Sequence, residues 1–369
     1  MKNKYSYKNT NFNNAKKSKN DEFYTQLSDI EKELIHYKDQ FKDKIVYCNC
    51  DNPLYSNFWK YFYSNFDKFK LKKLITTYFV KGKSKHNLLD DSKEYVYSYK
   101  WEISKDNKEI VKTKLFGDGD FRSPECIDLL KESDIVCTNP PFSLFREYVD
   151  LLVKYDKKFL IIGNNNSITY KEIFKLIKDN KLWLGYNVNK TMDFILSDNY
   201  EKYNYIDKNG FKHGKVPAIT WFTNLDVKKR HEFLDLRFKS YKQNPELYPK
   251  YDNYNAINVN KVKDIPGDYN DAIGVPITYL EYYNPKQFEI IALGVVGSIK
   301  FTSNKKMEIL DKYGNSTGKF TFNAKGCLYR DYNSATDKSP AFRDVENDKL
   351  YSSIYARIII QKIKQKEVK

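Results

Sequence analysis

The sequence has few of the residues that hold metal ions, and its cysteines are scattered. It contains five cysteines and four histidines in 369 residues. Cys48 and Cys50 are separated by one residue in a stretch that reads as a strand, so we expect them to point to opposite faces. No second cysteine pair or histidine cluster lies at metal-ligand spacing. The pattern argues against a zinc site, against any metal requirement and against a disulfide framework, and it favours reduced structural thiols.

Long apolar runs are also absent. The longest are short stretches such as 159–162 and 358–360, whereas a membrane-spanning helix needs roughly 20 apolar residues. The N-terminus is basic and rich in asparagine, and it lacks the apolar segment of a signal peptide. These absences exclude a membrane protein and predict a cytoplasmic one. No internal repeat is visible.

Charge of one sign is in excess. Lysine and arginine number 64 against 48 acidic residues, which gives a formal net charge of +16. Such an excess favours a polyanionic partner, either nucleic acid or, less often, an acidic membrane face. The 32 tyrosines could stack on bases. However, lysine, asparagine and tyrosine have A/T-rich codons, so an A/T-rich genome can produce the same composition.

The order of elements predicts an α/β fold. Residues 1–20 read as a flexible basic arm, and 81–110 as an inserted hairpin. Ser28 and Glu31 form a capping box at the start of the first helix. Predicted strands cover 44–50, 71–80, 112–116, 134–138, 158–162 and 216–223; predicted helices cover 27–41, 57–66, a segment that begins at Ser123, 143–155 and 171–178.

Alternation of strands and helices with short turns predicts a mostly parallel sheet flanked by helices. We place this first domain at residues 21–230. Residues 231–369 are irregular and rich in tyrosine and asparagine, with strand-like segments at 288–293 and 354–361. The chain therefore divides into an arm, a sheet domain and a C-terminal region.

The most informative motif is Asn139-Pro140-Pro141-Phe142, which follows a short apolar strand and precedes a helix. In open α/β sheets, ligands bind beyond the carboxyl ends of the strands. A bare strand-terminating Asn-Pro-Pro turn is the alternative interpretation. The flanking strand and helix favour an active-site residue at Asn139.

The residue types suit methylation of a planar amino nitrogen, such as that of adenine. The lone pair of this nitrogen is delocalised, and two acceptors for its N–H groups would draw it toward a nucleophilic state. The Asn139 side-chain oxygen and the Pro140 carbonyl are such acceptors. Neither Pro140 nor Pro141 adds a competing N–H, and their fixed φ stiffens the turn. Phe142 could stack on the base, which would have to be flipped out of the duplex.

The motif resembles the fourth motif of the amino-methyltransferase superfamily, and the chain is similar to the EcoRI-type adenine-specific modification methylases. This resemblance implies a Rossmann-like methyltransferase domain with a C-terminal target-recognition region. It also implies a monomer that uses S-adenosyl-L-methionine to methylate adenine N6 in duplex DNA, often beside a restriction endonuclease. The resemblance rests on stretches 16–25, 46–51, 139–142, 274–278 and 283–291.

The resemblance also implies cofactor-binding residues. Phe23, Tyr24 and Thr25 match a segment near the methionine end of the cofactor, although Phe23 and Tyr24 could instead pack on the following helix. Asp120 and Phe121 match the motif that holds the cofactor's adenine, although Asp120 could be an ordinary turn residue.

The loop after the first strand departs from most methyltransferases. It contains no glycine, a departure shared with the EcoRI-type pattern. Asp51 in this loop could accept a hydrogen bond from the cofactor's ammonium group, or it could cap the next helix. An acid that binds the ribose should end the second strand, but 76–80 offers none.

DNA contacts are predicted at two basic clusters, which could equally be solvated surface: Lys16, Lys17 and Lys19, and Lys228, Lys229 and Arg230. Trp221 and Phe222 lie on a predicted core strand where related enzymes have an aromatic residue that faces the flipped base, but core packing explains both residues as well.

Alternative functions are RNA or protein-glutamine N-methylation, or a catalytically decayed DNA-binding protein. The target sequence is not readable, and GAATTC is a candidate only by analogy.

Overall fold

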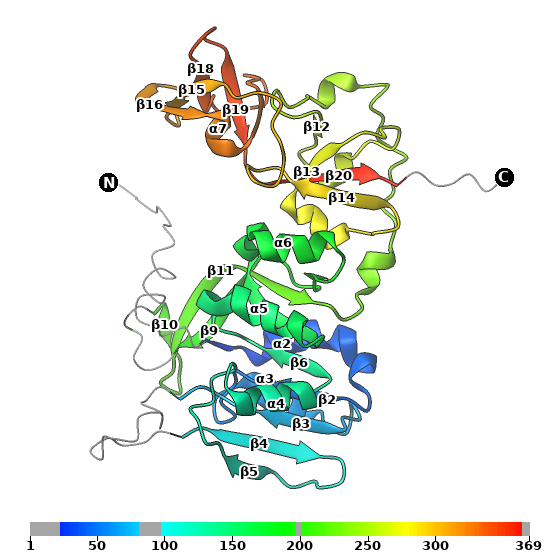
Figure 1. The fold of residues 1–369 in the computed structure, drawn as a ribbon, viewed down its shortest axis with the longest axis vertical. Helices are drawn as coiled ribbons and strands as arrows, with labels where there is room; N and C mark the ends of the chain where they lie inside the picture. Colours follow the sequence, from blue (N-terminus) through cyan, green and yellow to red (C-terminus); the bar gives the residue numbers. More distant parts are fainter. Residues whose placement is uncertain (1–22, 81–96, 197–200, 202, 364–369) are drawn as a thin grey trace, which may run out of the picture. The chain divides into compact units, whose positions relative to one another are not determined.

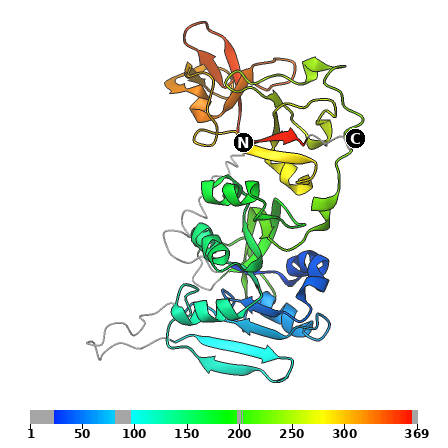
Figure 2. The same ribbon diagram turned by 45° about the vertical axis from the view of Figure 1, so that its right-hand side comes forward.

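The computed structural model describes residues 23–80, 97–196, 201 and 203–363. The basic arm of residues 1–20, with Lys16, Lys17 and Lys19, lies outside these residues. The chain forms two compact units, shown in Figures 1 and 2. The larger unit comprises Met1–Ile173 with Leu182–Val227, and the smaller comprises Phe174–Lys181 with Lys228–Lys369.

The larger unit contains an eleven-stranded sheet. Two short strands, β8 (Trp183–Leu184) and β10 (Tyr205–Ile206), pair with β11 beside the main path. The main path runs, in sheet order, through β1 (Phe23–Thr25), β9 (Lys190–Leu196), β11 (Lys212–Thr223), β7 (Lys158–Asn164), β6 (Ile135–Thr138), β2 (Ile45–Cys48), β3 (Lys73–Thr76), β4 (Tyr99–Ser104) and β5 (Val111–Lys114).

The sheet is mixed, not mostly parallel as predicted. Only the four central strands β7, β6, β2 and β3 are parallel to one another. The predicted strand at 112–116 is β5, an exposed edge strand antiparallel to β4, which is in turn antiparallel to β3. The short link between β4 and β5 explains this, because parallel strands need a long crossover.

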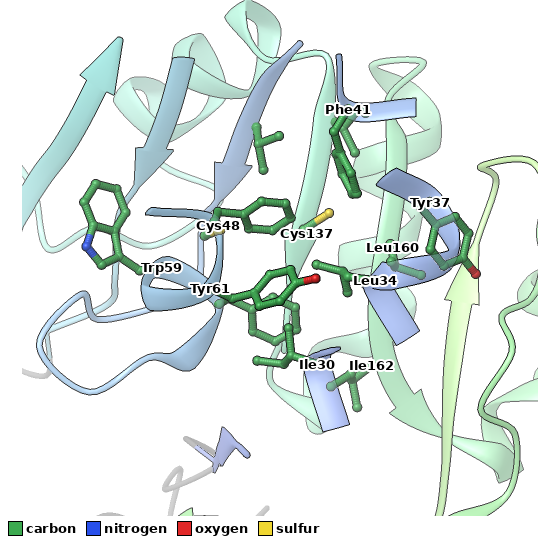
Figure 3. Packing of buried hydrophobic residues seen from close by; sticks show 14 of the residues in the cluster. Ile30, Leu34, Tyr37, Phe41, Cys48, Trp59, Tyr61, Cys137, Leu160 and Ile162 are labelled. Atoms are coloured by element: carbon green, nitrogen blue, oxygen red, sulfur yellow. The ribbon is translucent and has the colours of Figure 1, made fainter. Parts of the chain in front are cut away.

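Helices cover both faces of the central strands. Figure 3 shows Ile30 and Leu34 from α2 (Leu27–Leu34) and Tyr61 from α3 (Asn57–Ser64) packed with residues of β2, β6 and β7. Helices α4 (Pro124–Glu132) and α5 (Phe145–Lys154) lie over the opposite face (Figure 1). This two-sided cover explains why the central strands are continuously apolar.

The first helix differs from its prediction in two respects. Its second half, η1 (Ile35–Phe41), is a 3₁₀-helix. The predicted capping box is wrong, because the helix begins at Leu27, with Gln26 and not Ser28 as its N-cap and with no side-chain cap hydrogen bond. Ser28 therefore lies inside the first turn. By contrast, α4 begins as predicted, with Ser123 Oγ accepting from Cys126 N.

The smaller unit contains a four-stranded and a five-stranded sheet, and most of helix α6 (Lys171–Lys178) groups with it. The strand predicted at 288–293 is confirmed. The strand predicted at 354–361 is divided, because Ala356 has a positive φ of 48° between β19 and β20. The strands are β12 (Ile257–Asn258), β13 (Ile273–Pro276), β20 (Arg357–Lys362) and β14 (Phe288–Leu293), and then β16 (Ser316–Phe322), β15 (Lys306–Leu310), β18 (Phe342–Asp344), β19 (Leu350–Ile354) and β17 (Leu328–Asp331).

Candidate active site

The Asn-Pro-Pro turn, residues 139–141, connects β6 to the 3₁₀-helix η2 (Phe142–Leu144) and then α5. Asn139 is 9% exposed, and its side-chain Nδ2 donates to the carbonyl oxygen of Phe23 at 2.6 Å. Its Oδ1 is buried and has no hydrogen-bond partner among the described residues. A buried acceptor without a partner is unfavourable unless a ligand supplies a donor.

Strand β1 brings Phe23 to this turn. Phe23 pairs with Leu196 of β9, and its ring stacks on Phe142 with centroids 5.8 Å apart. The ring of Phe142 also meets Phe194 edge-on at 6.3 Å. Phe23 thus packs on β9 and on the Asn-Pro-Pro-Phe segment, and not simply on the helix that follows it. Sequence reasoning could not connect positions so far apart.

A pocket of about 500 Å³ opens beside the turn. This volume lies within the range of typical small-ligand sites. Its walls are β1 and the loops that follow β2, β3, β5 and β6, all in the larger unit. It is lined by Phe23, Tyr24, Asn49, Cys50, Asn52, Tyr78, Phe79, Gly119, Asp120, Phe121, Arg122, Asn139, Pro141, Ser143 and Leu144.

The pocket gathers six of the residues predicted for catalysis and cofactor binding. Four others adjoin it without lining it: Thr25, Asp51, Pro140 and Phe142. Thr25 is buried, and its carbonyl accepts from Asn57 Nδ2 at 2.7 Å. The six residues that line the pocket are Phe23, Tyr24, Asp120, Phe121, Asn139 and Pro141.

Asp120 is held by an arginine that sequence reasoning missed. Arg122 donates through Nε at 2.9 Å and through a terminal nitrogen at 2.6 Å to the two oxygens of Asp120. Burial alone would raise the pKa of Asp120, but the hydrogen bonds and charge of Arg122 outweigh it and lower this pKa. Asp120 is therefore an ionised acceptor at the pocket wall. The spacing Asp-x-Arg was a signal that could have identified Arg122.

Asp51 is buried behind the pocket. Its Oδ1 accepts from Ser56 Oγ at 2.6 Å, and its Oδ2 accepts from the Thr138 hydroxyl. Ser56 itself caps α3 by accepting from Phe58 N. Asp51 thus supports the residue that caps the helix. Burial raises the pKa of Asp51 to about 7, against the opposing hydrogen bonds from Ser56 and Thr138.

Sequence reasoning also missed the aromatic and amide lining. Tyr78 and Phe79 line the pocket after β3, where the predicted ribose-binding acid was not found. Asn49 and Asn52 flank Asp51 in the loop after β2, and Asn49 Oδ1 accepts from the Tyr148 hydroxyl. Their signal was position alone, since each follows the carboxyl end of a central strand.

Gly119 allows close approach of two loops. It has φ of +79°, and a Cβ at this position would lie 2.0 Å from the Tyr78 carbonyl oxygen. Only glycine fits such a position without a shift in the backbone.

The remaining predicted residues lie elsewhere. Trp221 and Phe222 are fully buried in the core, which confirms core packing for both. Lys228, Lys229 and Arg230 form the 3₁₀-helix η4 (Lys228–His231) of the smaller unit. There Arg230 donates to Asn180 Oδ1 at 3.0 Å.

Metal-binding and membrane features are absent from the described part of the chain. All five cysteines are free thiols, and no group of three His, Cys, Asp or Glu side chains in the described ranges could hold a metal ion. No described helix combines the length and the apolar character that crossing a bilayer requires.

Comparison with known proteins identifies the class of enzyme and then the family. The sequence model of the family described as adenine-specific methyltransferase EcoRI matches residues 11–363. The chain is therefore an adenine-specific DNA methyltransferase. It belongs to the EcoRI methylase family.

Two curated relatives illustrate the similarity. The chain is 55% identical over 287 residues to the type II methyltransferase M.EcoRI of Escherichia coli, covering 75% of this chain and 87% of the relative. It is 46% identical over 285 residues to the type II methyltransferase M.MgeORF184P of Mycoplasma genitalium, covering 76% and 85%. No solved structure matches the chain significantly.

Proposed function

We propose that this enzyme transfers a methyl group from S-adenosyl-L-methionine to N6 of an adenine flipped out of duplex DNA. The observation that carries the proposal is the buried Oδ1 of Asn139, a residue that lines the pocket, because this oxygen has no partner among the described residues. An adenine amino group would supply the N–H donor that this oxygen needs as a hydrogen-bond partner.

Asn139 and Pro140 would prepare the nitrogen for attack. Because Asn139 Nδ2 donates to Phe23, the amide is oriented with its oxygen as the remaining acceptor. A second acceptor, the Pro140 carbonyl, would take the other N–H, so that the nitrogen lone pair is directed at the incoming methyl group. Pro141 would hold this geometry, and Phe142 would hold the base. The bond between the methyl group and the sulfonium sulfur would break as the bond to N6 forms, which leaves S-adenosylhomocysteine, and N6 would then release one proton to solvent. Orientation of this kind supplies much of the rate enhancement in such reactions.

The pocket fits the cofactor in volume and in chemistry. S-adenosyl-L-methionine supplies an electrophilic methyl group on a sulfonium. Asp120 and Phe121 would accept from the adenine amino group and pack against its ring. Phe23, Tyr24 and Thr25 would lie against the methionine end of the cofactor. Asp51 would lie beside this end, in the loop after β2. The volume of about 500 Å³ and the ionised state of Asp120 support this assignment.

Two regions complete the proposal. Residues 21–230 form a Rossmann-like catalytic domain, supported by the four parallel strands at the centre of the sheet. Residues 231–369 form the target-recognition region. Lys16, Lys17, Lys19, Lys228, Lys229 and Arg230 would contact phosphates.

We further propose that the enzyme acts as a monomer without a metal ion, on nucleoid DNA in the cytoplasm. It would be the modification enzyme of a restriction-modification system, with a restriction endonuclease acting separately. The type II names of the relatives support this assignment.

The test is methyl transfer by the purified protein. Labelled S-adenosyl-L-methionine is offered together with duplex DNA, RNA or total protein as acceptor. We expect label only in duplex DNA, released as N6-methyladenine on digestion. Label in RNA or in glutamine side chains would contradict the substrate assignment. Failure to bind the cofactor in a titration would indicate a decayed enzyme.

A further inference from the structure

The backbone of Asp51 ties together the ends of two central strands. Its N–H donates to the carbonyl of Thr77, which follows β3, at 3.1 Å. Its carbonyl accepts from the hydroxyl of Thr76, the last residue of β3, at 2.6 Å. Asp51 itself follows β2, and is 3% exposed. The loop after β2 is therefore fixed to β3 before the side chain of Asp51 is considered.

The side chain extends this connection to two further elements. Its Oδ1 accepts from Ser56 Oγ at 2.6 Å, at the start of α3. Its Oδ2 accepts from the hydroxyl of Thr138, the last residue of β6. Thr138 directly precedes Asn139, and the two partners lie 87 positions apart in the sequence. One carboxylate thus bridges a helix start and the residue next to the Asn-Pro-Pro turn.

The neighbours of Asp51 show what this bridge could align. Cys50 and Asn52, on either side of it, line the pocket, and so does Asn139. Asp51 does not line the pocket, and both its oxygens have protein partners. We propose that Asp51 is a positioning residue, whose carboxylate holds the turn that presents Asn139 in register with the cofactor-lining loop.

This inference rests on the proposed roles of Asn139 and of the pocket. It differs from direct contact with the cofactor's ammonium group, because Asp51 acts through Thr138. A positioning group affects the reacting geometry, and misplacement of about 1 Å can lower a rate about a hundredfold. Loss of the bridge should therefore lower kcat more than it weakens cofactor binding.

The experiment compares three threonine variants of the full chain. Thr138→Val removes the hydroxyl that reaches Asp51, and Thr138→Ser keeps it. Thr223→Val is the matched control, because Thr223 is equally buried and its hydroxyl donates to the Phe159 carbonyl at 2.6 Å, away from the pocket. For each variant, kcat and KM on duplex DNA, the Kd for S-adenosyl-L-methionine, and Tm are measured.

We expect kcat of Thr138→Val to fall at least about tenfold, with a Kd for the cofactor within about threefold of wild type. Thr138→Ser should restore kcat, and Thr223→Val should keep kcat near wild type even where its Tm falls. The inference is overturned if Thr138→Val keeps wild-type kcat, if both valine variants lose kcat equally, or if only the cofactor Kd changes. Failure of the proposed function is a separate result, since wild type would then transfer no methyl group to adenine in duplex DNA.

Discussion

The side-chain nitrogen of Asn139 donates to the main-chain oxygen of Phe23 across 2.6 Å, and so joins residues 116 positions apart. The hydrogen bond leaves Oδ1 as the remaining acceptor of the Asn139 side chain, and this oxygen has no hydrogen-bond partner among the described residues. An N-terminal strand thereby orients the amide of a turn that is distant in sequence.

Replacing Asn139 by alanine should remove this acceptor while the fold remains. We expect kcat on duplex DNA to fall by about 10²–10³-fold or more, as for loss of a preorganised polar group in other active sites. Asn107→Ala, in the exposed turn between β4 and β5, should keep wild-type kcat. Steady-state methyl transfer measures both, and an active Asn139→Ala enzyme would contradict the mechanism.

Replacing Arg122 by glutamine should weaken cofactor binding. Asp120 would lose its bidentate partner, and its pKa would rise toward the ordinary range. We expect the Kd for S-adenosyl-L-methionine to increase about tenfold, or ~1.4 kcal/mol. Arg237 holds Asp235 in the same Asp-x-Arg geometry outside the pocket, so Arg237→Gln is the control. Equal Kd values for both variants would argue against Asp120 as a cofactor ligand.

Gly119→Ala should destabilise the fold more than Gly210→Ala. Both glycines have φ near +80°, but a Cβ at Gly210 meets nothing within 4 Å, whereas one at Gly119 collides with Tyr78. The positive φ alone costs about 1–2 kcal/mol in an L-residue. Urea unfolding should give this loss for Gly210→Ala and a larger one for Gly119→Ala. A smaller loss at Gly119 would mean that the loops after β3 and β5 do not pack as described.

The stability of the fold should depend on pH through Asp51. Its pKa is raised from 3.8 to about 7, so the folded chain retains a proton that the unfolded chain has already released. The contribution of this proton to the free energy of unfolding is therefore fully present below about pH 4 and is lost as pH rises to about 7. The facing thiols of Cys48, Cys50 and Cys137 stay protonated, because burial and then Asp51 raise the pKa of each.

Asp51→Asn separates this contribution from other titrating groups. We expect Tm of the wild type to fall more between pH 5 and pH 8 than Tm of Asp51→Asn. Differential scanning calorimetry at both pH values measures the two changes. Equal changes in the two proteins would show that Asp51 titrates near its ordinary pKa.

DNA binding should depend steeply on salt. If Lys228 and Lys229 each contact a phosphate, alanine at both should reduce the slope of log K against log salt by about 2. The control pair is Lys131→Ala with Lys175→Ala, which removes the same charge at lysines that contact Asp128 at 2.9 Å and Asp179 at 2.7 Å. An unchanged slope in the first double variant would exclude this cluster as a phosphate contact.

The elements that sequence predicted best are those determined locally. The strand, turn and helix around Asn139 were readable because an apolar run, two prolines and an amphipathic segment follow one another within about 20 residues. The edge position of β5 was not readable, since it depends on pairing with β4 and not on its own residues. Local pattern specifies elements, whereas pairing depends on distant partners.

The same division applies to the site. Asn139, Asp120 and Phe121 were predicted from motifs, and all three line the pocket. The Asp51–Thr138 hydrogen bond and the Phe23–Phe142 stack were not predictable in this way, because each joins segments about 90 or more positions apart. The role of Arg122 could have been predicted from its spacing to Asp120. The roles of Tyr78 and Phe79 could not, because aromatic residues after a strand more often pack in a core.

The most direct test of the account is a map of methylated adenines in DNA from cells that express the protein. We expect N6-methyladenine at one short recurring sequence with the wild type and none there with Asn139→Ala. The central claim is that the Asn139 oxygen activates an adenine in duplex DNA. Methylation of that sequence by both proteins would contradict this claim, and so would the absence of N6-methyladenine with the wild type.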